Sequence, residues 1–305
     1  MQLSIVTTLY KSEDYIEEFY NRILKVLKKL KFDDYEILFV NDGSPDNSDQ
    51  KVFDLIQKDK KIKYIELSRN FGHHNAIAAG LDICQGDIVY LLDVDLEDQP
   101  EWLEEFYETL VKKNLDVVYG VQKKRSGNLF RKFFGYTWYY FINKLSRIKQ
   151  DENLVTARIM TREYINSLVQ FTEKATIISG IFALAGFKQD KIFVKKKFRD
   201  KSTYSFSDKI DIVVKSMVSL TDKPLRLIIF INLIFSIIGF VYLVFTTISK
   251  IRADEYIPGW TSLALLISGS FILVSLTLVI LGLYLEQIYN EVKNRPKYII
   301  RKKIL

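Results

Sequence analysis

The sequence predicts an α/β domain, with a mostly parallel sheet covered by helices on both faces, followed by a hairpin of two transmembrane helices. The first observation is an alternation of short apolar runs with segments of helical periodicity over residues 3–121, which is typical of a parallel sheet. The second is a pair of long runs near the C-terminus that contain no charged residue and are long enough to cross a bilayer.

Short apolar runs predict buried strands at residues 3–9, 36–41, 62–67, 87–92 and 115–121. Apolar residues at helical spacing predict helices at residues 13–30, 48–58, 73–84 and 100–113. Polar clusters follow the second, third and fourth strands. Because the carboxyl ends of parallel strands meet at one edge of the sheet, where such domains bind ligands, we expect these clusters to converge there.

The charge-free runs cover residues 227–248 and 260–285, and the shorter run would span roughly 33 Å as a helix. Both flanks of the pair are more basic than the link over residues 249–259, so the positive-inside rule predicts that both termini lie in the cytosol. We therefore expect an integral protein of a bacterial-type cytoplasmic membrane, with a cytosolic domain over residues 1–205 and a basic cytosolic tail over residues 286–305.

Two further segments are candidates for the lipid headgroup layer. Residues 128–147 mix aromatic residues with Arg and Lys, and residues 206–226 form an amphipathic juxtamembrane helix in this interpretation. Ordinary core-facing helices are the alternative. Gly269 and the small residues around it would allow close helix packing, so the transmembrane pair can also form a homo-oligomer.

The net charge of +7 allows nucleic acid, anionic lipid or a small anionic substrate as a partner. The sequence contains no nucleic-acid motif, and its basic residues gather near the apolar runs, which favours a membrane surface and phosphate-bearing substrates. Cys84 is the single cysteine, so an internal disulfide is excluded and a Cys/His zinc site is not expected. Cys84 lies in an apolar stretch and is interpreted as a packed core thiol.

Asp93 and Asp95 follow the fourth predicted strand and are separated by one residue. Such a pair can hold Mg²⁺ or Mn²⁺, because these ions use one or two protein carboxylates and otherwise bind water and substrate phosphates. The metal would neutralise the charge that builds on a leaving nucleoside diphosphate. A helix N-cap is the alternative reading, since Pro100 opens a helix shortly afterwards.

Asp42 lies in the turn after the second strand, where its carboxylate could accept hydrogen bonds from a base or ribose. Turn chemistry alone would also explain this composition. Arg69 follows the third strand and could meet phosphate together with the N-terminus of the next helix. A metal role for His73 and His74 is not expected, because adjacent histidines do not share a helix face.

Four segments carry a resemblance to a known family: VNDGSPDNS, SRNFGHHNAIAAGLD, GDIVYLLDVDLEDQPEW and VVYGVQKKR. In order and spacing they resemble glycosyltransferase family 2, within it the branch of dolichol-phosphate mannose synthase and bacterial polyprenyl-phosphate sugar transferases. A two-helix C-terminal anchor also occurs in that bacterial branch. The resemblance implies a GT-A type (Rossmann-like) fold, a nucleotide-diphosphate sugar donor, and inverting transfer of one sugar to a polyprenyl phosphate.

The resemblance also implies a role for each candidate residue. Asp93 and Asp95 would be the catalytic pair that serves metal and diphosphate, with Asp95 the more direct ligand of Mg²⁺ or Mn²⁺. The residues expected to contact the nucleotide sugar are Thr8, Asp42, Arg69, Asp93 and Glu97. The residues expected to bind donor or lipid phosphate are Arg125, Arg131, Lys132 and Arg199.

Three positions depart from the family's pattern. Glu97 stands where the family often has Gln, and Gln122 stands where Arg is frequent. Thr156, in the stretch Val-Thr-Ala-Arg-Ile, replaces the aspartate of Gly-Asp-Phe-Arg-Leu. These changes leave the donor sugar open and are compatible with an amino or deoxy hexose.

The acceptor determines how much acid–base chemistry the enzyme needs. A sugar hydroxyl must lose a proton, whereas a lipid monophosphate is anionic at neutral pH and can attack without a general base. The absence of a carboxylate at Thr156 is therefore tolerable with a polyprenyl phosphate acceptor. The alternatives are transfer to a hydroxyl of a lipid-linked glycan and a non-catalytic membrane scaffold that binds nucleotide sugar. A processive polysaccharide synthase is not expected, because no tryptophan follows Gln-X-X-Arg.

Overall fold

The structure is a computed structural model that describes residues 1–122, 151, 153–171, 178–196, 223–252 and 259–305. The chain divides into two units. One is a sheet domain, to which residues 295–305 also belong. The other consists of two long helices and ends at Asn294, and each unit is described by itself.

Eight strands of the described residues form one sheet, in the order β7-β5-β6-β4-β1-β2-β3-β8. Their bounds are β1 Leu3–Leu9, β2 Tyr35–Asn41, β3 Ile62–Leu67, β4 Ile88–Leu91, β5 Val117–Gln122, β6 Leu154–Thr161, β7 Gln189–Val194 and β8 Ile300–Ile304. Strands β4, β1, β2 and β3 pair in parallel, and so do β5 and β7. Strand β6 is antiparallel to β4 and β5, and β8 is antiparallel to β3. The sheet is therefore mostly parallel, as predicted.

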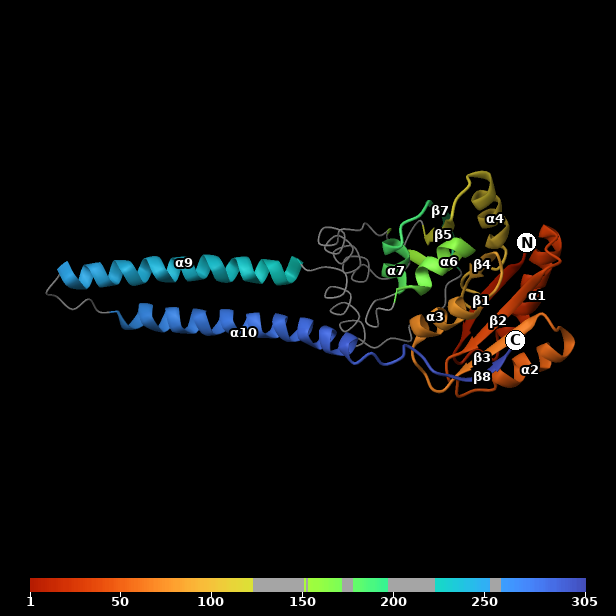
Figure 1. Cartoon of the computed structure of the whole chain (residues 1–305), viewed down its shortest axis with the longest axis horizontal. Coiled ribbons are helices and arrows are strands. Elements are labelled where there is room, and N and C mark those ends of the chain that lie inside the picture. Colours follow the sequence, from red (N-terminus) through yellow and green to blue (C-terminus); the bar gives the residue numbers. More distant parts are fainter. Residues whose placement is uncertain (123–150, 152, 172–177, 197–222, 253–258) are drawn as a thin grey trace. The chain divides into compact units, whose positions relative to one another are not determined.

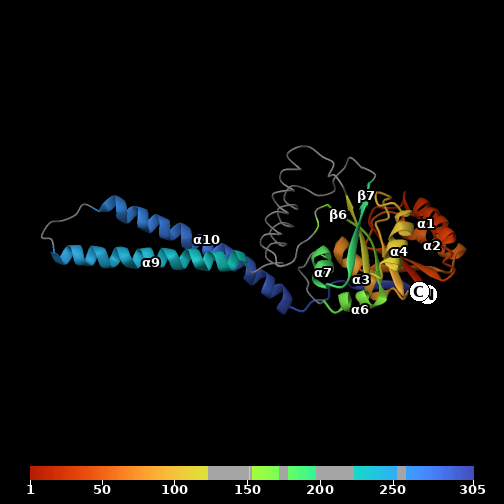
Figure 2. The same ribbon diagram turned by 90° about the horizontal axis from the view of Figure 1, so that it is seen from above.

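Helices cover both faces of the sheet (Figures 1 and 2). One face packs against α1 (Ile16–Leu30), α2 (Ser48–Lys58) and α4 (Trp102–Lys112). The other face packs against α3 (His73–Ile83), α6 (Arg162–Val169) and α7 (Ile178–Leu184). This two-sided cover is the reason why the central strands read as continuous apolar runs in the sequence.

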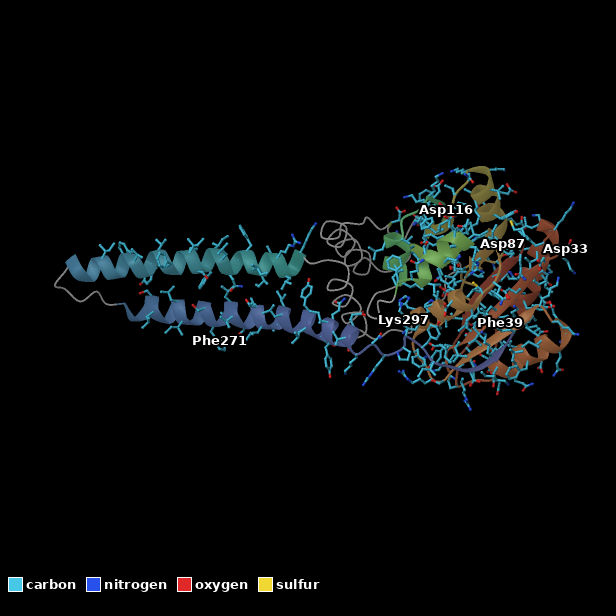
Figure 3. All side chains as sticks on the ribbon, in the orientation of Figure 1. Asp33, Phe39, Asp87, Asp116, Phe271 and Lys297 are labelled. Carbon is cyan, nitrogen blue, oxygen red and sulfur yellow. The ribbon has the colours of Figure 1, made fainter. Side chains whose placement is uncertain are left out.

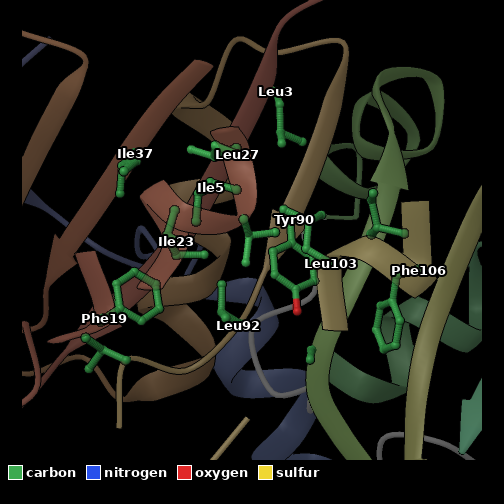
Figure 4. Packing of buried hydrophobic residues seen from close by; sticks show 14 of the residues in the cluster. Leu3, Ile5, Phe19, Ile23, Leu27, Ile37, Tyr90, Leu92, Leu103 and Phe106 are labelled. Atoms are coloured by element: carbon green, nitrogen blue, oxygen red, sulfur yellow. The ribbon is translucent and has the colours of Figure 1, made fainter. Parts of the chain in front are cut away.

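The core has two layers, because successive residues of a strand point to opposite faces. Leu3 and Ile5 of β1 pack with Phe19 of α1 in one layer (Figure 4). Val6 of the same strand belongs to the other layer, where α3 lies close to the sheet. A Cβ at Gly80 of α3 would lie only 2.5 Å from Val6 Cγ1, so this helix needs its small residues to reach the sheet.

The carboxyl ends of β1, β2, β3 and β4 meet at one edge of the sheet, here called the carboxyl edge. The start of β6 reaches this edge, since Arg158 pairs with Leu91 at the end of β4. Lys196 follows the carboxyl end of β7 there, because β7 runs parallel to β5 and β5 is antiparallel to β6. Strand β8 begins at the same edge, where Ile300 pairs with Leu67 at the end of β3.

The second unit is a pair of helices, α9 (Lys223–Arg252) and α10 (Trp260–Val292), each apolar and long enough to cross a membrane. Their 30 and 33 residues correspond to about 45 and 50 Å. Most of their apolar side chains are exposed, unlike those of a core helix in a soluble protein; Phe271 of α10 is 73% exposed (Figure 3). The expected spans 227–248 and 260–285 lie inside these helices, which extend further at their ends.

The C-terminal segment differs from the basic tail expected over residues 286–305. Helix α10 continues to Val292, and residues 300–304 form β8 at the edge of the sheet. The second half of the sheet domain, with β6, α6, α7 and β7, was also not predicted from the sequence. Residues 128–147, and residues 206–222 of the expected juxtamembrane helix, lie outside the described part of the chain.

Candidate active site

The acidic pair lies at the carboxyl edge, directly after β4. Asp93 and Asp95 are separated by the buried Val94, and a tight turn follows in which Leu96 has a positive φ of 61°. Asp95 Oδ1 accepts a hydrogen bond from the backbone N–H of Glu97 at 3.0 Å. Leu96 is itself buried, and this burial offsets the cost of a left-handed conformation in a residue with a Cβ.

A chain of polar contacts passes through Asp93 and links several elements. Thr156 Oγ1, in β6, donates a hydrogen bond to Asp93 Oδ2 at 2.8 Å. His73 begins α3, and its Nε2 lies 3.5 Å from Asp93 Oδ1. The other ring nitrogen of His73, Nδ1, lies 3.1 Å from Thr8 Oγ1 in β1. Side chains from β6 and α3 therefore hold the Asp93 carboxylate from both of its oxygens.

Asp95 retains a carboxylate oxygen, Oδ2, that accepts no hydrogen bond from the described residues. Burial raises the pKa of Asp95, and repulsion from Asp93 acts in the same direction. A bound cation would offset both effects. Within the described ranges, no three His, Cys, Asp or Glu side chains are grouped to hold a metal ion, so a metal here would also need water and substrate oxygens.

Asp98 lies behind the pair, and its side chain is fully buried. Its Oδ2 accepts a hydrogen bond from the backbone N–H of Ala157 at 2.9 Å, whereas Oδ1 has no hydrogen-bond partner among the described residues. Burial, with repulsion from Asp93, raises the pKa of Asp98 to about 7. Lys196 approaches from β7, with Nζ 3.0 Å from Glu97 Oε2 and 3.5 Å from Asp98 Oδ1.

Asp42 joins two loops of the carboxyl edge. Its side chain is buried, and its oxygens accept hydrogen bonds from the backbone N–H groups of Phe71 at 2.7 Å and Gly72 at 3.0 Å. Burial raises the pKa of Asp42, although these hydrogen bonds act in the opposite direction. Gly43 has a φ of 62°, and a Cβ there would lie 2.6 Å from the carbonyl carbon of Arg69. Close packing of these loops therefore requires glycine at this position.

The six candidate residues that the structure describes all lie at or beside the carboxyl edge: Thr8, Asp42, Arg69, Asp93, Asp95 and Glu97. Arg69 is exposed, and its guanidinium lies 4.0 Å from the centre of the Phe71 ring. The carboxylate of Asp42 is engaged by the backbone, which the sequence did not predict. The phosphate-binding candidates lie outside the described residues: Arg125, Arg131, Lys132 and Arg199.

Sequence reasoning missed His73, Asp98 and Lys196 as members of this site. Asp98 could have been noticed as a further carboxylate just after the Asp93 and Asp95 pair. Lys196 is one of three consecutive lysines that follow β7. Side chains alternate between the two faces of a strand, so Lys196 lies on the same side as the buried Val194, whereas Lys195 is exposed. The contact between His73 and Asp93 depends on tertiary structure and has no local signal.

The comparison with known families agrees with this geometry. Residues 4–176 match the family Glycosyl transferase family 2. The chain belongs to glycosyltransferase family 2. It is therefore a glycosyltransferase, and its mostly parallel sheet with helices on both faces is the GT-A fold implied by the resemblance.

Two bacterial relatives of this family 2 member match nearly its whole length. The SfII prophage-derived bactoprenol glucosyl transferase of Shigella flexneri is 32% identical over 309 residues, covering 99% of this chain and 98% of that protein. The undecaprenyl-phosphate 4-deoxy-4-formamido-L-arabinose transferase of Proteus mirabilis is 29% identical over 311 residues, covering 99% and 93%. Among solved structures, the Pyrobaculum calidifontis mannosyltransferase in complex with GDP-Man and Mn²⁺ is 15% identical, with a TM-score of 0.47, covering 96% of this chain and 86% of that chain.

Proposed function

We propose that this glycosyltransferase transfers a single sugar, with inversion, from a nucleotide-diphosphate sugar to a polyprenyl phosphate at the cytosolic face of the membrane. The product would be a polyprenyl-phosphate-linked monosaccharide. The observation that carries the proposal is the position of Asp93 and Asp95 at the sheet edge from which the chain leads to the two membrane helices. The names of the two bacterial relatives, which refer to bactoprenol and undecaprenyl phosphate, support the same class of acceptor.

The connectivity of the sheet supports a lipid-borne acceptor. Strand β7 ends at the carboxyl edge with Val194, and the chain then proceeds to α9. Strand β8 begins at this edge with Ile300, immediately after α10 and a short link. Both connections between the sheet and the helices therefore start at the edge that carries the acidic pair. This arrangement suits a reaction in which the donor is soluble and the acceptor is anchored in the bilayer.

We assign Asp95 as the direct ligand of Mg²⁺ or Mn²⁺ and Asp93 as its partner. The residues fit this role, because Asp95 has a free carboxylate oxygen among the described residues and burial raises its pKa. The metal, when bound, would neutralise the negative charge that develops on the leaving nucleoside diphosphate. Thr156 and His73 orient Asp93 before the donor arrives, which reduces the reorganisation that the reaction requires.

The loop after β3 is the proposed nucleotide side of the site. Asp42 fixes this loop through the N–H groups of Phe71 and Gly72, so its effect on the donor is exerted at least in part through the loop. The loop leads directly into α3, whose first backbone N–H groups are suited to phosphate. Exposed Arg69 can add a guanidinium to the same phosphates.

The acceptor phosphate needs no general base, which agrees with the chemistry of Thr156. This hydroxyl donates to Asp93 and does not remove protons at neutral pH, so attack by a sugar hydroxyl would have to find its base elsewhere. Arginines bind phosphate through a fork of N–H groups, so we propose Arg125, Arg131 and Arg199, assisted by Lys132, as ligands of lipid phosphate.

The proposal is tested with full-length protein purified in detergent and incubated with undecaprenyl phosphate and a panel of nucleotide sugars, with Mg²⁺, Mn²⁺ or EDTA. Mass spectrometry of the lipid fraction should show the acceptor increased by one sugar residue, with no product in EDTA. A product found only on a lipid-linked glycan would support the hydroxyl-transfer alternative instead. Donor binding without product from any acceptor would support a scaffold.

The first prediction concerns the metal ligand. Asp95→Asn should lower the transfer rate by about 100-fold or more, because it removes a charge at the reacting centre while preserving size. The unfolding temperature should change little, and it can be measured by thermal unfolding in detergent.

Asp33→Asn is the matched control, because Asp33 is exposed and lies before β2 at the opposite edge of the sheet (Figure 3). This variant should retain the wild-type rate. Turnover of Asp95→Asn within a few-fold of wild type would remove the assigned metal role.

A further inference from the structure

Lys196, which follows β7, forms ion pairs with two of the acidic residues that follow β4, Glu97 and Asp98. Lys196 Nζ is 3.0 Å from Glu97 Oε2 and 3.5 Å from Asp98 Oδ1. The side chains of Lys196 and Glu97 are 21% and 26% exposed, and that of Asp98 is fully buried. Charges in such a partly closed environment interact more strongly than charges at an open surface.

Lys196 remains charged in this position. Burial by itself would lower the pKa of Lys196, but attraction to Asp98, Asp93 and Glu97 outweighs burial and raises the pKa. Arg158, in β6, is also buried, but its guanidinium has other partners. Its Nε donates to the carbonyl of Thr156, and its guanidinium stacks on a phenylalanine ring.

The acidic cluster consists of Asp93, Asp95, Glu97 and Asp98. We propose that Lys196 is its internal counter-cation, pairing with Glu97 and Asp98 and offsetting part of their charge, so that Asp93 and Asp95 bind a divalent metal firmly only together with the donor diphosphate. This inference rests on the proposed function, since it concerns the same metal. It makes Lys196 a positioning residue for the carboxylates.

Lys196 would lower the affinity for metal alone because it reduces the number of carboxylates available to bind an ion. The backbone N–H of Glu97 donates a hydrogen bond to Asp95 Oδ1, so Glu97 lies in the same turn as Asp95, the proposed metal ligand. Without the ammonium of Lys196, the Glu97 carboxylate would stand beside Asp93 and Asp95 as a third oxygen donor with no cation to offset its charge. Hard divalent cations bind more tightly as the number and charge of oxygen ligands increase. A metal could then occupy the cluster without a donor.

The unpartnered oxygen of Asp98 supports the same assignment. Asp98 Oδ1 is buried and receives no hydrogen bond from the described residues, yet it lies 3.5 Å from the ammonium of Lys196. A buried carboxylate oxygen without a hydrogen bond is costly unless a cation compensates it. The pair also suits Glu97 at a position where the family pattern that this sequence resembles often has the neutral Gln, because the ammonium of Lys196 offsets the added negative charge.

The experiment measures Mn²⁺ affinity by calorimetry on the full-length, donor-free protein, and again with UDP or GDP present. Lys196→Met should bind Mn²⁺ alone about tenfold more tightly than wild type, since a unit positive charge near the ion is removed. The double variant with Glu97→Gln should return toward wild type, because the third carboxylate is also absent. Lys196→Arg, which keeps the charge, should stay within about twofold of wild type.

Lys195→Met is the matched control, because it removes the same charge from the adjacent exposed residue. Its Mn²⁺ affinity should equal that of wild type, and an increase as large as that of Lys196→Met would assign the effect to net charge and overturn the inference. Thermal unfolding of each variant shows that it is folded, and Lys196→Gln replaces Lys196→Met if the latter is not.

The outcomes separate the inference from the proposed function. Wild type that binds Mn²⁺ with UDP or GDP, together with unchanged or weaker binding of Mn²⁺ alone by Lys196→Met, would overturn the counter-cation and leave the proposed function intact. Wild type that binds no Mn²⁺ with any nucleoside diphosphate would remove the metal role, and the inference with it.

Discussion

Asp93 illustrates how one residue of this site depends on its neighbours. Thr156 stands where the family pattern that this sequence resembles often has an aspartate, and its hydroxyl donates a hydrogen bond to Asp93 at 2.8 Å. A carboxylate at that place would add a further negative charge beside Asp93, Asp95 and Asp98, and would raise their pKa values. The threonine instead donates a hydrogen bond. The substitution is thus compatible with an acceptor that is already anionic and needs no base.

Cys84 provides a prediction about pH at the residue scale. The thiol is 4% exposed, and burial raises the pKa of Cys84 to about 11, although Arg162 opposes this shift. Because the folded-state pKa is raised, folding favours the neutral thiol, and the thiolate forms only as pH rises toward that value. Ellman's reagent at pH 8 should react at least about 100-fold more slowly with native than with unfolded protein, since the thiolate is the nucleophile. Rapid labelling of native protein would contradict the assignment of Cys84 as a packed core thiol.

At the scale of elements, β6 is the strand that completes the acidic site. It inserts antiparallel between β4 and β5, and its first residues bring the hydroxyl of Thr156 and the backbone N–H of Ala157 to the acidic residues after β4. Arg158 is buried in the same strand, and burial lowers the pKa of Arg158 to about 10, so the guanidinium remains charged at neutral pH.

The pair of helices α9 and α10 carries a second element-scale prediction. Asn232 Nδ2 donates to Thr277 Oγ1 at 2.8 Å, which joins the two helices through polar side chains in otherwise apolar segments. Hydrogen bonds of this kind contribute about 0.6 kcal/mol on average in membranes. A double-mutant cycle with Asn232→Leu and Thr277→Val should therefore give a coupling free energy of about 0.5–1 kcal/mol, measured by reversible unfolding in detergent.

The same cycle contains its own control, because each single variant reports the packing effect of its substitution without the partner. A coupling free energy indistinguishable from zero would mean that this hydrogen bond does not stabilise the helix pair. Activity should be largely retained in all three variants, since neither residue lies in the sheet domain.

At the scale of the whole molecule, the chain leaves the sheet domain, forms two apolar helices and returns to complete the sheet. Strand β8 pairs with β3, and the backbone N–H of Ser68 donates to the carbonyl of Ile299 at 2.8 Å. Tyr298 donates its hydroxyl proton to Asp82 Oδ2 at 2.7 Å. The returning segment therefore covers the otherwise unpaired edge of β3 and contacts the start of the loop proposed to bind the nucleotide.

Removal of this segment gives a prediction at the whole-molecule scale. A chain truncated before Arg295 should unfold at a temperature lower by about 5 °C or more, because loss of a paired strand costs several kcal/mol in a domain of this size. It should also aggregate more readily, since the edge of β3 becomes available to other chains. Differential scanning fluorimetry and light scattering measure the two effects.

Deletion of Leu305 alone is the control, because this exposed residue lies beyond the end of β8. Its unfolding temperature should match that of wild type. An equal unfolding temperature for the longer truncation would show that β8 contributes nothing to stability.

The first half of the fold could be predicted because each element there carries its own local pattern. The apolar runs at residues 3–9 and 62–67 coincide with β1 and β3, and the helical spacing at residues 48–58 coincides with α2. The later elements could not, because β6 and β7 are stabilised by strands distant in sequence, and the charged residues inside β8 conceal an edge strand. In the site, the polar clusters that follow the second, third and fourth strands could be predicted from the sequence. The side chains that contact their carboxylates, such as Thr156 and Lys196, could not.

The sequence by itself determined the fold class, the two apolar helices and the position of Asp93 and Asp95 after a buried strand, because these depend on periodicity and local composition. It also determined the membership of glycosyltransferase family 2, through the resemblance carried by four ordered motifs and the match of residues 4–176. The tertiary structure alone decided which side chains meet those carboxylates. Thr156 and Lys196 lie more than 60 residues away along the chain and reach the acidic turn only through strand pairing. Hydrogen bonds and ion pairs depend on distance in space, and distance in space is set by how the sheet is assembled.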